Sequence, residues 1–301
     1  MYKKMLVLLD GSKLAEVVFT YAQELSARLN IALELLHICT PQEAEQLPMR
    51  QAYMDHMAEI LQSKAAEIRS NIGATEGTHI PAHGKVLVGY PAEEIINYAE
   101  KNNIDLIMLS THGRSGIRMW HIGNVAHKVI HAAKVPIWLV PAELREEIIY
   151  DKLATKTMVI PLDGSELSEE VIPHAINIAK QRGARSGIVL IYVEKPYGQE
   201  GYGKSWVEHL EAERLSMKKY LDDKVQQFGK EGIAARAEIL IGEPASTIIN
   251  FVKENPAQLI AMTTHGRVGI SRMIFDDLAE NILHLVKKTP ILLVKPSKVI
   301  K

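Results

Sequence analysis

The sequence predicts two α/β domains in tandem, each with a parallel β-sheet covered by helices on both faces. First, motifs recur at one fixed distance: Asp10-Gly11-Ser12 and Thr111-His112-Gly113-Arg114 both return 153 positions later. Second, short continuous apolar runs alternate with helical patterns, which is typical of buried parallel strands joined by right-handed crossovers. Third, the 301 residues suffice for two domains, since domains run to roughly 100–200 residues each.

In the first half, apolar runs predict strands at Met5–Leu9, Ile31–Leu36, Ile104–Leu109 and Ile137–Val140. Helical spacing of apolar residues predicts helices at Ala15–Leu29, Gln51–Ile72, Pro91–Lys101 and from Val125 onward. The third of these helices is the best defined, because proline stands in its first turn and two acidic side chains follow.

The second half repeats this pattern. Its strands are expected at Met158–Leu162, Ile188–Val193, Ala235–Ile241, Leu259–Thr263 and Ile291–Val294. Its helices are expected at Glu166–Arg182, Trp206–Phe228, Ala245–Glu254 and Leu278–Lys287. The charged stretch Glu143–Thr155 reads as a linker that is partly helical. We therefore expect a first domain at 1–142, a linker at 143–155 and a second domain at 156–301.

Composition excludes several classes of protein. The formal net charge of −1 provides no overall field that would attract nucleic acid or an anionic membrane. Cys39 is the single cysteine, which excludes an intrachain disulfide and a cysteine-rich metal site. The apolar stretch near the N-terminus stops at Asp10 and is too short to span a bilayer. We expect a cytoplasmic protein without a membrane or nucleic-acid partner.

Chemistry-bearing residues fall where open α/β sheets bind ligands, at the carboxyl ends of strands. Asp10 follows the first strand, His37-Ile38 closes the second, and Ser110-Thr111-His112-Gly113 follows the fourth. Gly123-Asn124 then opens a helix, whose N-terminus offers N–H groups and positive dipole charge to a phosphate. Alternatively, Gly113 and Gly123 are turn glycines and Asn124 is an N-cap. The residues alone leave both interpretations open.

Over both halves, the chain resembles the universal stress protein family in its tandem form. Nucleotide-binding members carry G-x-x-G, nine residues, and then G-[S/T] after the fourth strand. Here Gly113 and Gly123 match, whereas Ser110 replaces the first glycine and Asn124 replaces the hydroxyl residue. The resemblance implies two flavodoxin-like domains (adenine nucleotide alpha hydrolase-like), each with a five-stranded parallel sheet of order 3-2-1-4-5.

The same resemblance implies a ligand and a role in stress response and regulation. Asp10 would contact the nucleoside, Ile38 would line the adenine pocket, and Gly113, Gly123 and Asn124 would hold the phosphates. We predict that the first domain binds ATP, with ADP and AMP as alternatives and Mg²⁺ as an optional companion ion. The predicted site comprises Leu9, Asp10, Ile38, Ser110, His112, Gly113, Gly123, Asn124 and Val125.

The second half differs at the phosphate position, where Asp276-Asp277 replaces Gly123-Asn124. Two carboxylates suit a helix N-terminus but would repel a phosphate there, by roughly 1 kcal/mol at 4 Å in water and more at a partly buried site. We predict that this half does not bind ATP in the family manner. A structural role, a neutral or cationic ligand, and a nucleoside without phosphates stay open.

No catalytic residues are predicted. The P-loop, the dinucleotide-binding pattern and the G-x-S-x-G elbow are all missing from the sequence, and no general base is evident. Any ATP hydrolysis would be slow. His127 and His131 could face one metal ion, but without H-E-x-x-H we favour surface histidines and predict no metal site. A scaffold that binds no nucleotide and a slow ATP hydrolase are the alternative functions.

Two apolar strands need partners. The runs at 135–140 and 289–294 are expected at sheet edges, and an exposed apolar edge strand tends to pair. Equivalent strands of the family commonly pair between subunits. We therefore predict that these two pair within the chain to form a pseudo-dimer, and we leave a homodimer open.

Overall fold

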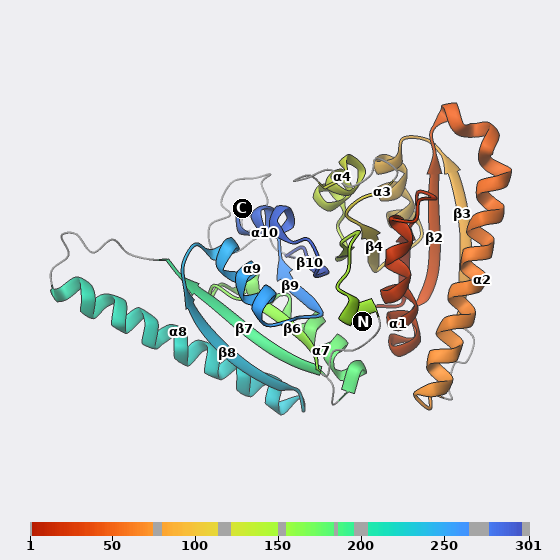
Figure 1. Cartoon of the computed structure of the whole chain (residues 1–301). Helices are drawn as coiled ribbons and strands as arrows, with labels where there is room; N and C mark the ends of the chain where they lie inside the picture. Colours follow the sequence, from red (N-terminus) through yellow and green to blue (C-terminus); the bar gives the residue numbers. More distant parts are fainter. Residues whose placement is uncertain are drawn as a thin grey trace. The chain divides into compact units, whose positions relative to one another are not determined.

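A computed structural model describes residues 2–74, 80–113, 122–149, 155–183, 186–195, 204–264 and 277–296. The chain divides into two compact units (Figure 1). The first comprises residues 1–152 with 287–293, and the second comprises 153–286 with 294–301. Within the described residues, every helix is too short or too polar to cross a bilayer.

The first unit contains the expected parallel sheet. Its strands are β1 (Lys4–Leu8), β2 (Ala32–Cys39), β3 (Ala82–Val88), β4 (Leu106–Ser110) and β5 (Ile137–Val140). They lie in the order β3-β2-β1-β4-β5 and are all parallel, which confirms the predicted order. A strand from near the end of the chain, β10 (Ile291–Val294), pairs antiparallel with β5, so the two predicted edge strands pair with each other.

Helices cover this sheet because their apolar faces are buried against it. They are α1 (Phe19–Leu29), α2 (Leu47–Asn71), α3 (Pro91–Lys101) and α4 (Asn124–Ala132), with 3₁₀ turns at Ala15–Val18 and Pro41–Gln46. Helix α1 packs against α2, and α3 packs against α4. In the core, Trp138 of β5 is fully buried and its ring lies 5.5 Å from that of Tyr21 of α1.

The second unit repeats the arrangement. Its strands are β6 (Lys156–Pro161), β7 (Ser186–Glu194), β8 (Ala234–Ile241) and β9 (Leu259–Thr263). They are parallel and lie in the order β9-β6-β7-β8, which corresponds to 4-1-2-3 of the first unit. The helices are α6 (Glu166–Glu169), α7 (Ile172–Arg182), α8 (Lys204–Lys230), α9 (Pro244–Glu254) and α10 (Asp277–Leu285).

The structure refines three sequence expectations. Strand β3 was missing from the elements expected in the first half. The predicted linker contains a short helix, α5 (Glu146–Ile149). Helix α4 begins at Asn124 with Gly123 as its N-cap, so the interpretation of Asn124 as the N-cap is wrong.

Candidate functional site

A cavity of about 390 Å³ lies at the carboxyl ends of the central strands of the first unit. The order of the strands reverses here, because β1 is followed outward by β2 on one side while β4 lies on its other side. Ligands of open α/β sheets bind at such a point, and this volume suits a small molecule. The nine residues of the predicted site all line this cavity: Leu9, Asp10, Ile38, Ser110, His112, Gly113, Gly123, Asn124 and Val125.

Two more lining residues, His37 and Thr111, were noted at strand ends in the sequence but were not assigned to the site. Sequence reasoning missed the rest of the lining, which comprises Leu8, Ala15, Leu36, Thr40, Glu43, Pro91, Ile95, Leu109 and Ala126. Two of them form a capping box, in which Glu43 Oε2 accepts from the Thr40 backbone N–H and hydroxyl at 3.0 and 2.9 Å. This S/T-x-x-E pattern was readable in the sequence. It rigidifies the cavity wall that follows β2.

The turn after β1 holds the Asp10 carboxylate in place. Its Oδ1 accepts a hydrogen bond from the Ser12 backbone N–H at 2.9 Å. The Ser12 hydroxyl oxygen in turn accepts from the Ala15 N–H at 3.2 Å, which supports a capping role for this serine rather than a nucleophilic one. Asp10 is therefore oriented by backbone groups before any ligand arrives.

The first turn of α4 directs backbone N–H groups at the cavity. The N–H of Gly123 is used, because it donates to the Thr111 carbonyl at 2.9 Å. The first bond within the helix runs from the His127 N–H to the Gly123 carbonyl. Helical geometry leaves the N–H groups of residues 124–126 without a partner inside the helix. In the part of the chain that the structure describes, no side chain caps this turn.

Hydrogen bonds fix the imidazole of His112. The Thr111 hydroxyl lies 2.9 Å from His112 Nδ1, and its oxygen also lies within 3.3 Å of the Ala142 N–H, from which it accepts. The hydroxyl still has its own proton to donate, and when it donates to Nδ1 the imidazole proton resides on Nε2. That nitrogen is buried, and among the described residues it has no hydrogen-bond partner, so it can donate to a ligand.

His37 closes another part of the cavity. The side chain is buried, and its Nδ1 lies 2.8 Å from the carbonyl oxygen of Leu9. Because a carbonyl only accepts, Nδ1 carries the proton and donates it. This bond ties the end of β2 to the residue that follows β1, which helps to hold the cavity mouth in shape. The sequence had placed this polar residue at the end of an apolar run, but its bond to Leu9 was not expected.

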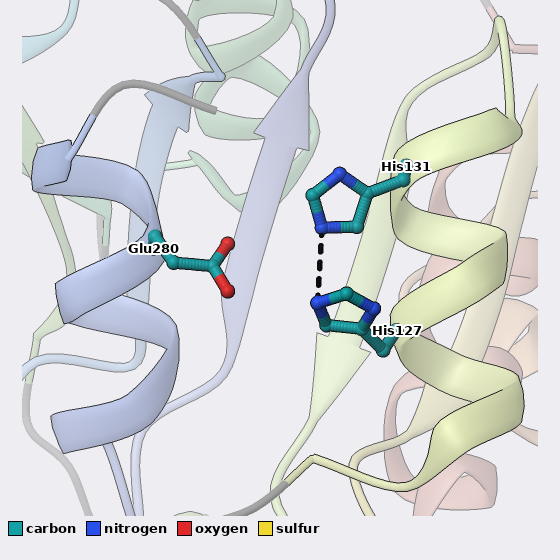
Figure 2. A group of neighbouring side chains, drawn as sticks. All are labelled: His127, His131 and Glu280. Carbon is teal, nitrogen blue, oxygen red and sulfur yellow. Dashed lines mark hydrogen bonds between the residues drawn. The ribbon is translucent and has the colours of Figure 1, made fainter. Parts of the chain in front are cut away.

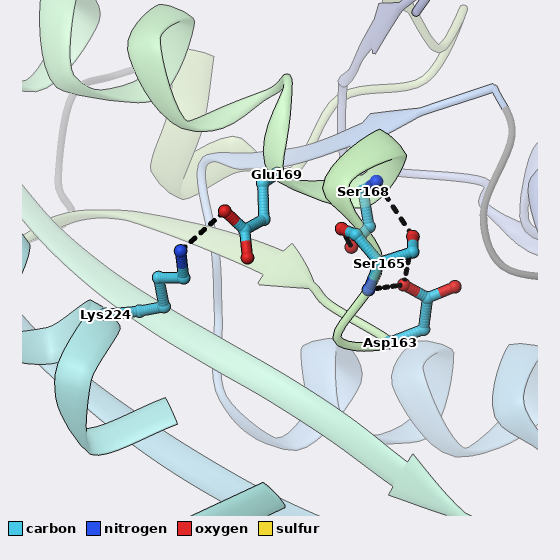
Figure 3. Close-up of polar contacts among 5 residues, drawn as sticks. All are labelled: Asp163, Ser165, Ser168, Glu169 and Lys224. Atoms are coloured by element: carbon cyan, nitrogen blue, oxygen red, sulfur yellow. Dashed lines mark hydrogen bonds and ion pairs between the residues drawn. The ribbon is translucent and has the colours of Figure 1, made fainter. Parts of the chain in front are cut away.

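The second unit has a smaller cavity in the equivalent place, of about 100 Å³. Asp163 lines it as Asp10 lines the first, and its Oδ1 accepts from the N–H and the hydroxyl of Ser165 at 2.9 and 2.6 Å (Figure 3). Ser165 caps α6, since its side-chain oxygen accepts from the Ser168 N–H at 3.1 Å. Close by, Lys224 of α8 pairs with Glu169.

Two more side chains of the second unit lie at this turn and this cavity. Met217 of α8 packs over the turn at Gly164, where an added Cβ would lie 3.1 Å from its terminal methyl. Tyr192 lines the second cavity at the position that His37 has in the first. The predicted pair Asp276-Asp277 lies outside this description, because residue 276 is not described and only the backbone of residue 277 is.

Comparison with known proteins gives the family. The family model described as "Universal stress protein family" matches residues 1–141 and 154–295. Universal stress protein MJ0531 of Methanocaldococcus jannaschii is 34% identical over 147 residues, 48% of this chain and 84% of that protein. Universal stress protein Rv2005c of Mycobacterium tuberculosis is 21% identical over 301 residues, 96% of this chain and 95% of its own.

Solved structures share the fold over the whole chain. A universal stress protein from Archaeoglobus fulgidus has a TM-score of 0.64 at 20% identity, with 97% of this chain and 98% of that chain covered. A putative universal stress protein from Pseudomonas aeruginosa has a TM-score of 0.67 at 15% identity, with 98% and 94% covered. The chain belongs to the universal stress protein family and contains two copies of its domain in tandem.

Proposed function

We propose that the first unit binds an adenine nucleotide and that this binding regulates the protein in a stress response. The observation that supports it most directly is the cavity of about 390 Å³. Within the described residues, three N–H groups of α4 lack a side-chain cap there, and His112 Nε2 has no hydrogen-bond partner. Donors of this kind at a helix N-terminus suit phosphate oxygens.

The phosphate end of the proposed site is built around Gly123. Its φ of −56° is open to any residue, and an added Cβ would lie 3.5 Å from the nearest atom, the Thr111 carbonyl oxygen. Among the described residues, nothing therefore requires glycine at this position. A ligand that approaches the backbone closely does, and a phosphate on the first turn of α4 is such a ligand.

The nucleoside end is mostly apolar. Ile38 and Ile95 are buried side chains that line the cavity on the β2 and α3 sides and offer a dry surface for a base. Asp10, held by the turn after β1, is placed to accept from ribose hydroxyls, as the resemblance to nucleotide-binding members implies. The combination of an apolar wall and a few polar groups is typical of small-molecule sites.

The proposal assigns one nucleotide to each chain. The second cavity has about 100 Å³, a quarter of the first, and Asp276-Asp277 replaces the phosphate-binding pair in the sequence. We therefore propose a structural or regulatory role for the second unit. Nucleotide binding in the first unit would change the affinity for a partner.

Calorimetric titration of the nucleotide-stripped protein with Mg-ATP tests this proposal. We expect one site per chain, with weaker binding of ADP and AMP because fewer phosphate oxygens meet the donors of α4. Two sites per chain would show that the second unit also accepts phosphate. A protein that takes up no nucleotide would favour the scaffold function instead.

Substitutions at Gly123 test the location of the site. Gly123→Asp places a carboxylate where the phosphate would lie and should abolish binding of Mg-ATP, whereas Gly123→Ala should fold normally and weaken it. Gly229→Asp is the matched control, because it adds the same charge in α8, where an added Cβ meets nothing within 4 Å. Unchanged binding by Gly123→Asp would refute the location.

A further inference from the structure

Two histidines on the exposed side of α4 form a pair that the nucleotide site does not use. His127 and His131 are four positions apart, so they lie one above the other on the same face of the helix. Their Nε2 atoms are 3.1 Å apart, and the ring centroids are 4.3 Å apart (Figure 2). The sequence alone favoured surface histidines without a metal ion, but this geometry leads to a different inference. We propose that this pair chelates a divalent transition-metal ion of the zinc, nickel and copper class.

The separation of the two nitrogens fits two ligands of one metal ion. Zinc–imidazole bonds are about 2.0–2.1 Å long. Two such bonds to nitrogens 3.1 Å apart enclose an angle of about 95–102° at the metal. This lies between the right angle of square-planar and octahedral sites and the wider tetrahedral angle. Metals of the class can therefore bind without a change in the helix.

The helix fixes this geometry in advance. Ala126, Val129 and Ile130 of α4 are buried and hold the opposite face of the helix in the core. His127 is exposed and His131 is half-buried, so solvent reaches the pair and water molecules can complete the coordination shell. A preformed pair of ligands loses little conformational entropy when the metal binds.

The chemistry of the ligands selects the ion. Imidazole suits Zn²⁺, Cu²⁺ and Ni²⁺, whereas Mg²⁺ and Ca²⁺ prefer oxygen ligands. The site should therefore not bind the Mg²⁺ that accompanies a nucleotide. The same 3.1 Å separation also fits an N–H···N hydrogen bond between the rings. A metal ion displaces the shared proton, since both nitrogens must be deprotonated to bind it.

The second repeat has a related pair at the matching positions of α10. Glu280 and His284 stand 153 positions after His127 and His131, and the His284 Nε2 lies 3.2 Å from Glu280 Oε1. A carboxylate thus replaces one of the two imidazoles. It forms an ion pair with the remaining imidazole when His284 is protonated. His127→Glu would copy this pair into α4, and it should bind Ni²⁺ more weakly than the native pair of imidazoles.

Titration of the metal-stripped full chain with Ni²⁺ or Zn²⁺, in excess Mg²⁺ and without nucleotide, tests the site. We expect one site per chain. His127→Ala and His131→Ala should each weaken it by about tenfold or more, since loss even of a residue that supports a ligand typically costs about 10–100-fold. His56→Ala is the control, because it removes an exposed histidine from α2. Wild-type affinity in both α4 variants, or equal weakening by His56→Ala, would overturn the proposal.

Electron paramagnetic resonance of bound Cu²⁺ separates loss of a ligand from loss of the fold. The wild-type spectrum should show hyperfine splitting from two equatorial nitrogens, and His131→Gln should show one, with an unchanged circular dichroism spectrum. Two nitrogens in the His131→Gln variant would contradict the assignment. None of these readouts depends on nucleotide binding, so the proposal stands or fails apart from the proposed function.

Discussion

Asp10 and Gly113 touch across the carboxyl ends of β1 and β4, so closely that a Cβ at position 113 would lie 1.9 Å from Oδ2 of Asp10. No side chain larger than hydrogen fits there unless the carboxylate moves. At Gly113 an added side chain therefore meets a group of the protein itself, whereas at Gly123 it meets only an ordinary contact among the described residues. The two glycines of the motif after β4, Gly113 and Gly123, are therefore explained by different physical causes.

This contact predicts the effect of Gly113→Ala. The added methyl group would displace Oδ2 of Asp10, and this movement should strain the hydrogen bond that Oδ1 accepts from the Ser12 N–H. We expect a loss of about 1–3 kcal/mol in the free energy of unfolding, the usual cost of overpacking, and weaker nucleotide binding. Urea denaturation measures the first effect, and calorimetry measures the second.

A double-mutant cycle checks the cause. Asp10→Ala removes the group that clashes, so Gly113→Ala should cost much less stability in that background than in the wild type. Additive losses for the two substitutions would mean that the methyl group meets something other than Asp10, and the structural explanation of Gly113 would be wrong.

His112 should contribute to phosphate binding through Nε2–H. His112→Phe keeps an aromatic ring but removes this donor, and a hydrogen bond to a charged group is worth about 1.5–3 kcal/mol. We expect the Kd for Mg-ATP to rise by about 10–100-fold. The Kd for adenosine should change much less, because adenosine has no phosphate to accept the bond.

Thr111→Val tests how the proton reaches Nε2. Valine has the shape of threonine but cannot donate to His112 Nδ1, so the proton divides between the two ring nitrogens. We expect a loss of ATP affinity smaller than that of His112→Phe. If Thr111→Val left binding unchanged while His112→Phe weakened it, the hydroxyl would have no part in setting the tautomer.

The central strands were readable from the sequence because they are uniformly apolar, and the resemblance to the family implied their order, but the residues of β3 were not identified. Apart from the buried Val86, its residues are half-buried or exposed, as at an edge. The strand depends on α2, since Gln51 of that helix donates to the Gly84 carbonyl and accepts from the Val86 N–H, both at 3.0 Å. An added Cβ at Gly84 would lie 2.5 Å from the backbone of Met54. Such contacts between distant segments leave no periodic signal.

The site was predictable to the extent that the ends of parallel strands meet at one edge of a sheet. This rule and the family motif placed nine residues, and all nine line one cavity. The bonds from His37 to Leu9 and from Thr111 to His112 depend on the side-chain orientations that folding produces. The start of α4 was shifted by one residue for a similar reason, because the Gly123 N–H is satisfied by the carbonyl of Thr111.

Two features could exclude a nucleotide from the second unit: the charge of Asp276 and Asp277 and the small volume of the cavity. Asp276→Gly with Asp277→Asn would restore the pair found in the first half and remove both carboxylates from the start of α10. We expect the variant still to bind one Mg-ATP per chain, because a cavity of about 100 Å³ leaves too little room. The stoichiometry from calorimetry tests this expectation. When Gly123→Asp is added to abolish binding in the first unit, no site should remain. Binding in the second unit of either variant would show that charge alone excludes phosphate.

His174 on α7 should make the stability of the second unit depend on pH. Burial lowers its pKa from 6.5 to about 4, against a smaller opposing effect of Glu170. Below about pH 6.5, His174 therefore binds a proton in the unfolded chain but stays neutral in the folded unit. The contribution of His174 to the free energy of unfolding is full above this pH and falls as the pH drops toward 4. As the pH is lowered from 7 to 4, the urea midpoint should fall less steeply for His174→Gln than for wild type. The control is His83→Gln, at an exposed position of β3, which should show the same dependence of the midpoint on pH as wild type. Equal slopes for all three proteins would mean that His174 titrates alike in the folded and unfolded states.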